Sequence, residues 1–240
     1  MNILQDCPVL LFLLTGAVTS IFLKKLTPTA AITGGILGWI VYAGGGYTGL
    51  GILALFFMLG TAATSWKKKE KLSIRANAGH QSTRTTGQVV ANAGVAALAA
   101  LMALFFPSQK HLFQLAMAGS MSAAIADTLS SELGMVYGRR FYNILTWHPD
   151  EKGEDGVVSI EGLLIGIAGS ALIAMVYAHS FFILVLAGTI GNLADSLLGA
   201  LFERRNILSN NTVNFLNTLT GALAVGLFAQ IPQFHTFSYL

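Results

Sequence analysis

The chain has 240 residues, of which 54% are hydrophobic and only 10% are charged, and its formal net charge is +3. Soluble domains carry about 25% charged residues, so this composition, with a mean hydropathy of +0.65, excludes an ordinary soluble protein. The single cysteine, Cys7, excludes an internal disulfide. We therefore expect an all-α, polytopic membrane protein that forms one helical bundle over residues 1–240.

Eight apolar segments of roughly membrane-spanning length follow one another along the chain. They cover residues 8–23, 28–45, 47–65, 86–106, 112–134, 157–178, 180–202 and 211–231. The first has the length of a signal peptide, but no basic region precedes it, so we treat it as a helix. Short connections such as "TPTA", "GGGY" and "AHS" favour antiparallel neighbours. The sequence thus predicts about eight transmembrane helices.

Basic residues are concentrated in the loops on one side of this arrangement. With strict alternation, every Lys and Arg of the 14 falls on that side except Lys110. Because Lys and Arg are enriched in cytosolic loops, we expect that side to face the cytosol. Both termini then lie outside, and in a bacterium the protein belongs in the inner (plasma) membrane.

Two similar stretches each place a carboxylate inside an apolar run. The first, "AAIADTLSSELGMVYGRR", spans residues 123–140, and the second, "GNLADSLLGALFERR", spans residues 191–205. Counted from the outer ends of their helices, Asp127 and Asp195 lie about 22 Å and about 21 Å along the axis. Against a hydrocarbon core of about 30 Å, both lie at one level in the cytosolic third. The repeat predicts two equivalent carboxylates from two parallel helices.

Further polar residues are expected at the same level, and these are Gln88, Asn92, Ser131, Glu132, Glu161, Asn192, Ser196, Asn214 and Asn217. Ionisable groups at membrane depth are costly and usually face a cavity or a partner. Carboxylates, amides and hydroxyls without clustered His or Cys suit a hard cation such as Mg²⁺. Basic loops beside such a cation favour phosphoryl transfer to a lipid-borne acceptor. The sequence contains no Walker motif and no protein-kinase motif.

The same residues also have simpler explanations. Asn92, Ser131 and Ser196 could only hydrogen-bond to neighbouring helices. Asp127 and Asp195 could form a structural pair, and the "KKKEK" run fits an anchor beside anionic lipid headgroups. Intramembrane acids also mark secondary transporters, but matched helices from an inverted repeat would be antiparallel. A lipid-bound scaffold is a third class, and it does not explain two acids at equal depth.

Five motifs, in order along the chain, resemble a known family, and they read "TRTTGQVVANAGVAAL", "ADTLSSELG", "GEDGVVSIEG", "GNLADSLLGA" and "NNTVNFLNTLTGA". They are similar to the signatures of the phytyl-phosphate kinase and transmembrane protein 19 family over roughly residues 80–230. The resemblance implies a helical membrane protein and an isoprenoid-monophosphate kinase. Two loops depart from the family pattern: Thr83 stands where glycine is common, and "GEDG" adds Glu154 and Asp155 to a turn.

The resemblance also implies site residues, carried over by their positions in these motifs: Arg84, Gln88, Asn92, Asp127, Glu132, Glu161, Asn192, Asp195, Asn214 and Asn217. We expect Asp127, Asp195 and Glu132 to be the catalytic carboxylates, with Mg²⁺ held by Asp127, Asp195 and Asn217. The nucleotide site is expected to use Gln88, Asn92, Glu161, Asn192, Asn214 and Asn217. The phosphate charge is expected to be neutralised by Arg84, Arg139, Arg140 and Arg204.

The resulting hypothesis is a kinase that acts at the cytosolic end of the bundle. A nucleoside triphosphate (CTP, UTP or ATP) binds there with Mg²⁺, and an isoprenyl monophosphate attacks the γ-phosphorus. Because that acceptor is already anionic, no strong general base is needed. An isoprenol kinase acting on the free alcohol is the alternative. The expected partners are the isoprenoid substrate and membrane lipids but no nucleic acid, and a homo-oligomer is compatible with the sequence.

Overall fold

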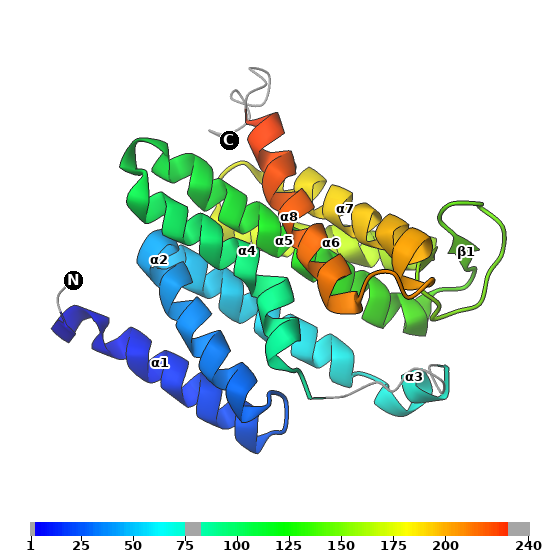
Figure 1. Cartoon of the computed structure of the whole chain (residues 1–240), viewed down its shortest axis with the longest axis horizontal. Helices are drawn as coiled ribbons and strands as arrows, with labels where there is room; N and C mark the ends of the chain where they lie inside the picture. The colour runs from blue at the N-terminus through cyan, green and yellow to red at the C-terminus, as the bar shows by residue number, and fades with distance from the viewer. Residues whose placement is uncertain (1–2, 75–82, 230–240) are drawn as a thin grey trace.

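The computed structural model describes residues 3–74 and 83–229, which are mostly helical (Figure 1). The helices are α1 (Ile3–Phe22), α2 (Pro28–Ser65), α3 (Lys68–Ile74), α4 (Thr86–Phe105), η1 (Pro107–Gln109), α5 (Lys110–Tyr137), α6 (Ile160–Tyr177), α7 (Phe181–Leu198), η2 (Gly199–Glu203) and α8 (Asn210–Phe228). Two short strands, β1 (Tyr142–Asn143) and β2 (Val157–Val158), pair antiparallel in the loop between α5 and α6.

All eight predicted apolar segments are helical, and the differences lie at their ends and in one loop. Residues 157–158 form β2 instead of starting a helix, because Ser159 caps α6 by accepting a hydrogen bond from the Gly162 N–H at 3.1 Å. The predicted 66–85 loop contains the additional short helix α3. Its residues 75–82, residues 230–231 of the last segment and both chain ends lie outside the described residues.

Helix α2 contains a sharp turn that divides it into two arms. Gly46 has φ 64° and ψ −158°, a conformation open to glycine but strained for other residues. A Cβ on Gly38 would lie 3.5 Å from Leu53 Cδ2, although a straight helix would hold these residues about 22 Å apart. The arms 28–45 and 47–65 therefore fold back as a hairpin, as the "GGGY" connection predicts (Figure 1).

Successive helix ends alternate between the two ends of the bundle. The loops after α1, α2, α5 and α7 meet at one end, which we call the long-loop end, through contacts that join Leu26 to Arg84, Trp66 to Tyr137 and Gly156 to Ala200. At the opposite end, Gln114 Nε2 donates to the Gly44 carbonyl at 2.8 Å. The basic loops predicted to share one side therefore do share one end of the bundle.

Helix α5 lies at the centre of the bundle and packs against α2, α4, α6, α7 and α8 (Figure 1). Its buried face is built from small side chains, such as those of Ala118, Ala123 and Ala124, which let neighbouring backbones approach closely. A Cβ on Gly119 would lie 2.8 Å from the Gly221 carbonyl oxygen, so the crossing of α5 and α8 requires glycine.

Within residues 3–74 and 83–229, five helical stretches are long and apolar enough to cross a membrane, by length and composition: Pro28–Ser65, Thr86–Phe105, Pro107–Tyr137, Ile160–Tyr177 and Phe181–Glu203. The apolar part of α1, Asp6–Phe22, is shorter. These stretches support a polytopic helical membrane protein. The count of eight spans and the side on which the termini lie stay predictions.

Candidate functional site

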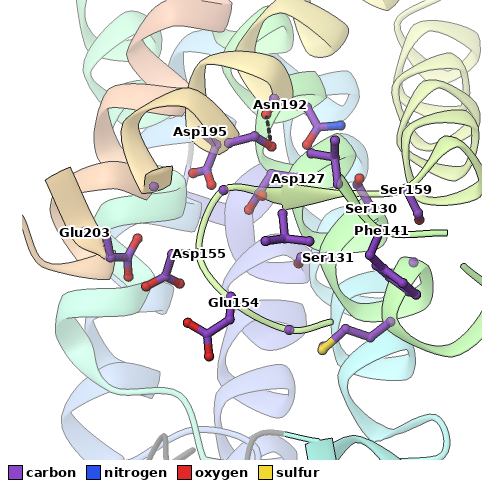
Figure 2. A pocket seen from close by; sticks show the side chains of 18 of the residues that line it. Asp127, Ser130, Ser131, Phe141, Glu154, Asp155, Ser159, Asn192, Asp195 and Glu203 are labelled. Atoms are coloured by element: carbon purple, nitrogen blue, oxygen red, sulfur yellow. Dashed lines mark hydrogen bonds between the residues drawn. The ribbon is translucent and has the colours of Figure 1, made fainter. Parts of the chain in front are cut away.

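A pocket of about 130 Å³ lies at the long-loop end between α5, α7 and the α5–α6 loop (Figure 2). Five of its lining residues carry carboxyl groups, and these are Asp127, Glu154, Asp155, Asp195 and Glu203. No Lys, Arg or His is among the described residues that line it. The pocket therefore concentrates negative charge without a basic side chain inside it.

The two aspartates predicted as a pair, Asp127 on α5 and Asp195 on α7, both line this pocket (Figure 2). Asp195 Oδ2 is buried and has no hydrogen-bond partner within the described residues. Asn192, which is 2% exposed, lies one turn before Asp195, and its carbonyl accepts from Ser196 Oγ at 3.2 Å. Because a buried carboxyl oxygen without a donor is costly, this geometry suits a bound cation or a proton.

The α5–α6 loop folds over the pocket and brings two further acids, Glu154 and Asp155, to its edge (Figure 2). The Ile144 N–H donates to the Gly156 carbonyl at 3.0 Å next to the β1–β2 pair. Gly156 has φ +76°, and a Cβ there would lie 2.3 Å from the Cβ of Ala200 in η2. Only glycine permits this close approach between the loop and the end of α7.

Arg204 fastens the same loop through a two-point contact with Asp150. Its Nη1 donates to Asp150 Oδ2 and its Nη2 to Asp150 Oδ1 at 3.2 Å, while Asn143 Nδ2 also donates to Oδ2 at 3.0 Å. The Arg204 guanidinium, together with the Asn143 amide and the Glu151 N–H, holds the pKa of Asp150 well below its usual range. Arg204, expected to neutralise phosphate, is therefore engaged in holding the loop.

The π turn η2 places Glu203 at the pocket. The Arg204 N–H donates to the Gly199 carbonyl at 3.0 Å, five residues back, which defines a π turn. In a regular α-helix, a residue eight positions after Asp195 would point about 80° away from Asp195 around the helix axis. The additional residue in the π turn offsets this rotation, and Glu203 joins Asp195 in lining the pocket.

The carboxylate oxygens of the pocket fit Mg²⁺ if the ligand and waters supply the other oxygen atoms of its coordination. Across residues 3–74 and 83–229, no three His, Cys, Asp or Glu side chains converge closely enough to hold a metal by themselves. Mg²⁺ in proteins is commonly held by one or two carboxylates together with substrate phosphates and waters. Asp127 and Asp195 can supply that carboxylate pair.

Of the other predicted residues, Glu161 and Arg139 meet beside the pocket. Glu161 Oε2 accepts a hydrogen bond from the Arg139 N–H at 3.3 Å. Both Arg139 and Arg140 have exposed side chains at the end of α5. Glu161 thus positions the backbone that carries the two arginines and does not itself line the pocket.

Glu132, expected to act with Asp127 and Asp195, lies on another face of α5. It is 7% exposed and pairs with Lys71, which is 5% exposed and belongs to α3. The Arg84 guanidinium lies 5.6 Å from the Phe56 ring centroid. Burial lowers the pKa of Arg84, and the Glu132 carboxylate opposes that shift. Neither Glu132 nor Arg84 lines the acidic pocket.

The four predicted amides on α4 and α8 do not line the pocket. Gln88 completes a capping box by accepting from the Thr85 N–H at 2.9 Å, and Asn92 donates to the Gln88 carbonyl at 2.9 Å. Asn214 donates to the Asn210 carbonyl at 2.9 Å.

Asn217 is fully buried, and neither side-chain polar atom has a partner within the described residues. Its Oδ1 lies 2.7 Å from the position of a Cβ on Gly191, one turn before Asp195. Asn217 is therefore one turn deeper in the bundle than the acidic pair.

Three of the five acids that line the pocket escaped the sequence-based prediction: Glu154, Asp155 and Glu203. The "GEDG" turn gave a signal for the first two, since it places two acids next to glycines that allow a tight loop. No sequence pattern indicates that Glu203 lines the pocket, because its position depends on the π turn.

The chain matches the integral membrane protein family DUF92 over residues 11–222. It is 35% identical over 219 residues to an uncharacterized membrane protein of Methanocaldococcus jannaschii, covering 86% of this chain and 88% of that protein. An uncharacterized membrane protein of Synechocystis sp. is 34% identical over 214 residues, 85% of this chain and 83% of that protein. Protein VTE6, chloroplastic, of Arabidopsis thaliana is 28% identical over 214 residues, 84% of this chain and 63% of VTE6. No solved structure gives a significant match. The chain belongs to the integral membrane protein family DUF92.

Proposed function

We propose that the protein is a membrane kinase that transfers the γ-phosphoryl group of a nucleoside triphosphate to an isoprenyl monophosphate, giving the diphosphate. The observation that carries this proposal is the pocket in which Asp127 and Asp195 meet without a lining basic residue. Such a pocket favours a ligand that brings its own cations, as a magnesium–nucleotide complex does. The resemblance of the motifs to phytyl-phosphate kinases, and the similarity to VTE6, support the choice of acceptor.

In this proposal, Asp127 and Asp195 hold Mg²⁺ from two sides, and nucleotide oxygens and waters complete its coordination. The bound cation neutralises charge that develops on the transferred phosphoryl group. Arg139 and Arg140, exposed beside the pocket, neutralise phosphate oxygens at its mouth. The isoprenyl tail lies along the apolar flank of α6, where Ile160 and Leu164 are exposed.

The proposed transfer needs no strong base from the chain. An acceptor phosphate oxygen bonds to the γ-phosphorus while the bond from that phosphorus to the β–γ bridging oxygen breaks, and the nucleoside diphosphate leaves. The acceptor oxygen carries no proton that must be removed first. The role of the chain is to position both phosphates and to exclude water. CTP, UTP and ATP are all compatible with this scheme.

The proposed topology has eight spans, both termini outside and the pocket facing the cytosol, in the inner membrane of a bacterial cell. Two observations support it: the hairpin at Gly46, and the gathering of the basic loops at the pocket end of the bundle. Cysteines introduced in the described part of the 135–156 loop should react only with reagents on the cytosolic side. Labelling of that loop from outside would overturn this topology.

The decisive experiment uses purified protein in detergent with labelled nucleotides and a panel of isoprenols and isoprenyl monophosphates. We expect Mg²⁺-dependent formation of isoprenyl diphosphate from the monophosphate without a membrane gradient. Phosphorylation of the free alcohol alone would identify an isoprenol kinase. Solute movement in sealed liposomes without nucleotide turnover would contradict the kinase assignment and favour a transporter.

A further inference from the structure

A patch of basic and aromatic side chains lies around the end of α2, outside the acidic pocket. We call it the lysine patch, and it consists of Lys25, Trp66, Lys67, Lys68, Lys69 and Tyr137. Glu70 is the acid that pairs with it within the described residues, and it contacts Lys67 at 3.3 Å. The patch therefore carries a clear excess of positive charge.

Contacts between different loops hold four of these side chains, those of Lys25, Trp66, Lys67 and Tyr137. Trp66 Nε1 donates to Tyr137 Oη at 2.9 Å, and the Lys67 ammonium lies 5.8 Å from the centroid of the Tyr137 ring. Lys25 Nζ donates to Ser65 Oγ at 2.8 Å, although 40 residues separate them in the sequence. Membrane orientation alone requires basic charge on one side, but it does not require these contacts.

Lys71 fixes the orientation of α3, so that Lys68 and Lys69 face outward. Its buried ammonium donates to the carbonyls of Ala63 at 2.7 Å and Thr64 at 3.0 Å, and it pairs with Glu132. Lys68 and Lys69 are exposed, and neither forms an ion pair with a described residue. Two ammonium groups are thus presented beside an ordered aromatic pair.

We propose that the lysine patch binds the phosphate headgroup of an anionic phospholipid. Trp and Tyr favour the zone where headgroups meet acyl chains, and Trp66 and Tyr137 end two long apolar helices. Ammonium groups form charge-assisted hydrogen bonds to phosphate oxygens. A lipid satisfies both features, because its headgroup meets the lysines while its chains continue along the apolar helices below the aromatic pair.

The test compares the motional restriction of spin-labelled phosphatidylglycerol and phosphatidylcholine around the full chain in proteoliposomes. Wild type should restrict phosphatidylglycerol more strongly. The double variant K68Q/K69Q should lower that preference by roughly tenfold or more, since each lysine near an anionic surface contributes about a factor of five. The matched control K110Q/R205Q removes the same charge from exposed positions outside the patch and should keep the wild-type preference.

The substitution Tyr137→Leu leaves the net charge unchanged, so it distinguishes a specific lipid-binding site from nonspecific electrostatic attraction of the lipid. It removes the ring under Lys67 and the hydroxyl that Trp66 contacts, and it should lower the preference by roughly two- to fivefold. An equal effect of the two charge variants, or no effect of Tyr137→Leu, would show that charge alone attracts the lipid and would overturn the site. Displacement of the labelled lipid by inorganic phosphate would also overturn the lipid site, because it would show that the patch binds soluble anions.

Discussion

Helix α5 carries two carboxylates five residues apart, and their surroundings differ sharply. Asp127 faces a pocket that it shares with four other acids and with no basic side chain among the described residues. Glu132 is buried against the ammonium of Lys71, which also contacts the last carbonyls of α2. The charge of Glu132 is thus compensated by Lys71, whereas no basic side chain of the described residues lines the pocket beside Asp127.

This difference distinguishes an acid with a structural partner from an acid that we propose to be functional. A compensated buried pair fixes α3 against the bundle, and removing one partner leaves the other charge uncompensated. Five acids around one pocket repel one another, and a cation bound among them stabilises the fold. The two regions should therefore respond differently to the same kind of substitution, with a loss of stability at Glu132 and a loss of turnover at Asp127.

The largest effect is expected for Glu132→Gln. This change leaves the buried ammonium of Lys71 without its carboxylate and should destabilise the fold by about 3–5 kcal/mol. Thermal unfolding in detergent measures it. The double variant Lys71→Met with Glu132→Leu should recover most of the loss, because an apolar pair removes both charges. If the Glu132→Gln protein is stable but has no turnover, Glu132 is a catalytic residue and not a structural one.

The next effect concerns Asp127→Asn and Asp195→Asn in the pocket. Each should lower turnover on the order of 10²-fold, about 2.7 kcal/mol of barrier. Folding should survive, because an amide is cheaper to bury than a carboxylate. Turnover measured against Mg²⁺ concentration should show partial rescue at high Mg²⁺.

Asp6→Asn is the matched control, since it makes the same chemical change on α1, outside the pocket. Near-normal activity in both pocket variants would show that the acid pair is structural.

The smallest effect is a pH dependence at the loop clasp between Asp150 and Arg204. The folded-state pKa of Asp150 is lowered, so its stabilisation is present above the unfolded pKa of about 3.9 and is lost as pH falls through the folded value. At neutral pH, Asp150→Asn should cost roughly 0.2–1 kcal/mol, discounted for solvent exposure. Thermal unfolding from pH 7 downward should show the difference from wild type shrinking in acid.

Glu151→Gln, at an exposed neighbouring position, serves as the control for that series. Its stability at neutral pH should differ less from wild type, because the contact between Asp150 and Arg204 stays in place. A stability difference for Asp150→Asn that persists unchanged in strong acid would show that shape, and not charge, links the loop to Arg204.

The long helices could be predicted because each follows an apolar run, whereas the short helix α3 lies in a basic segment that gave no such pattern. The meeting of Asp127 and Asp195 also followed from the sequence, since equal depth on two parallel helices depends only on the rise per residue. Lys71 could not be assigned in the same way. It lies in a run that resembles a headgroup anchor, and only its partner 61 residues away explains its burial.

The other differences between the predicted residues and those that line the pocket also depend on distant contacts. Asp155 reaches the pocket because Gly156 fits against Ala200, and Glu203 reaches it through a π turn. Neither event leaves a periodic signal in the sequence. Asn217 satisfied the residue types expected for the site, but helix packing places it one turn too deep to line the pocket.

The turn at Gly46 determines the direction in which every later helix of the chain runs. A continuous 38-residue helix would measure about 57 Å, nearly twice the thickness of a bilayer core. In the topology that we propose, folding back at one glycine turns a single long crossing into two and so adds one reversal to the path. Every helix after it inherits its direction from that reversal. In that topology, one residue without a side chain determines to which compartment a pocket more than 80 residues later opens.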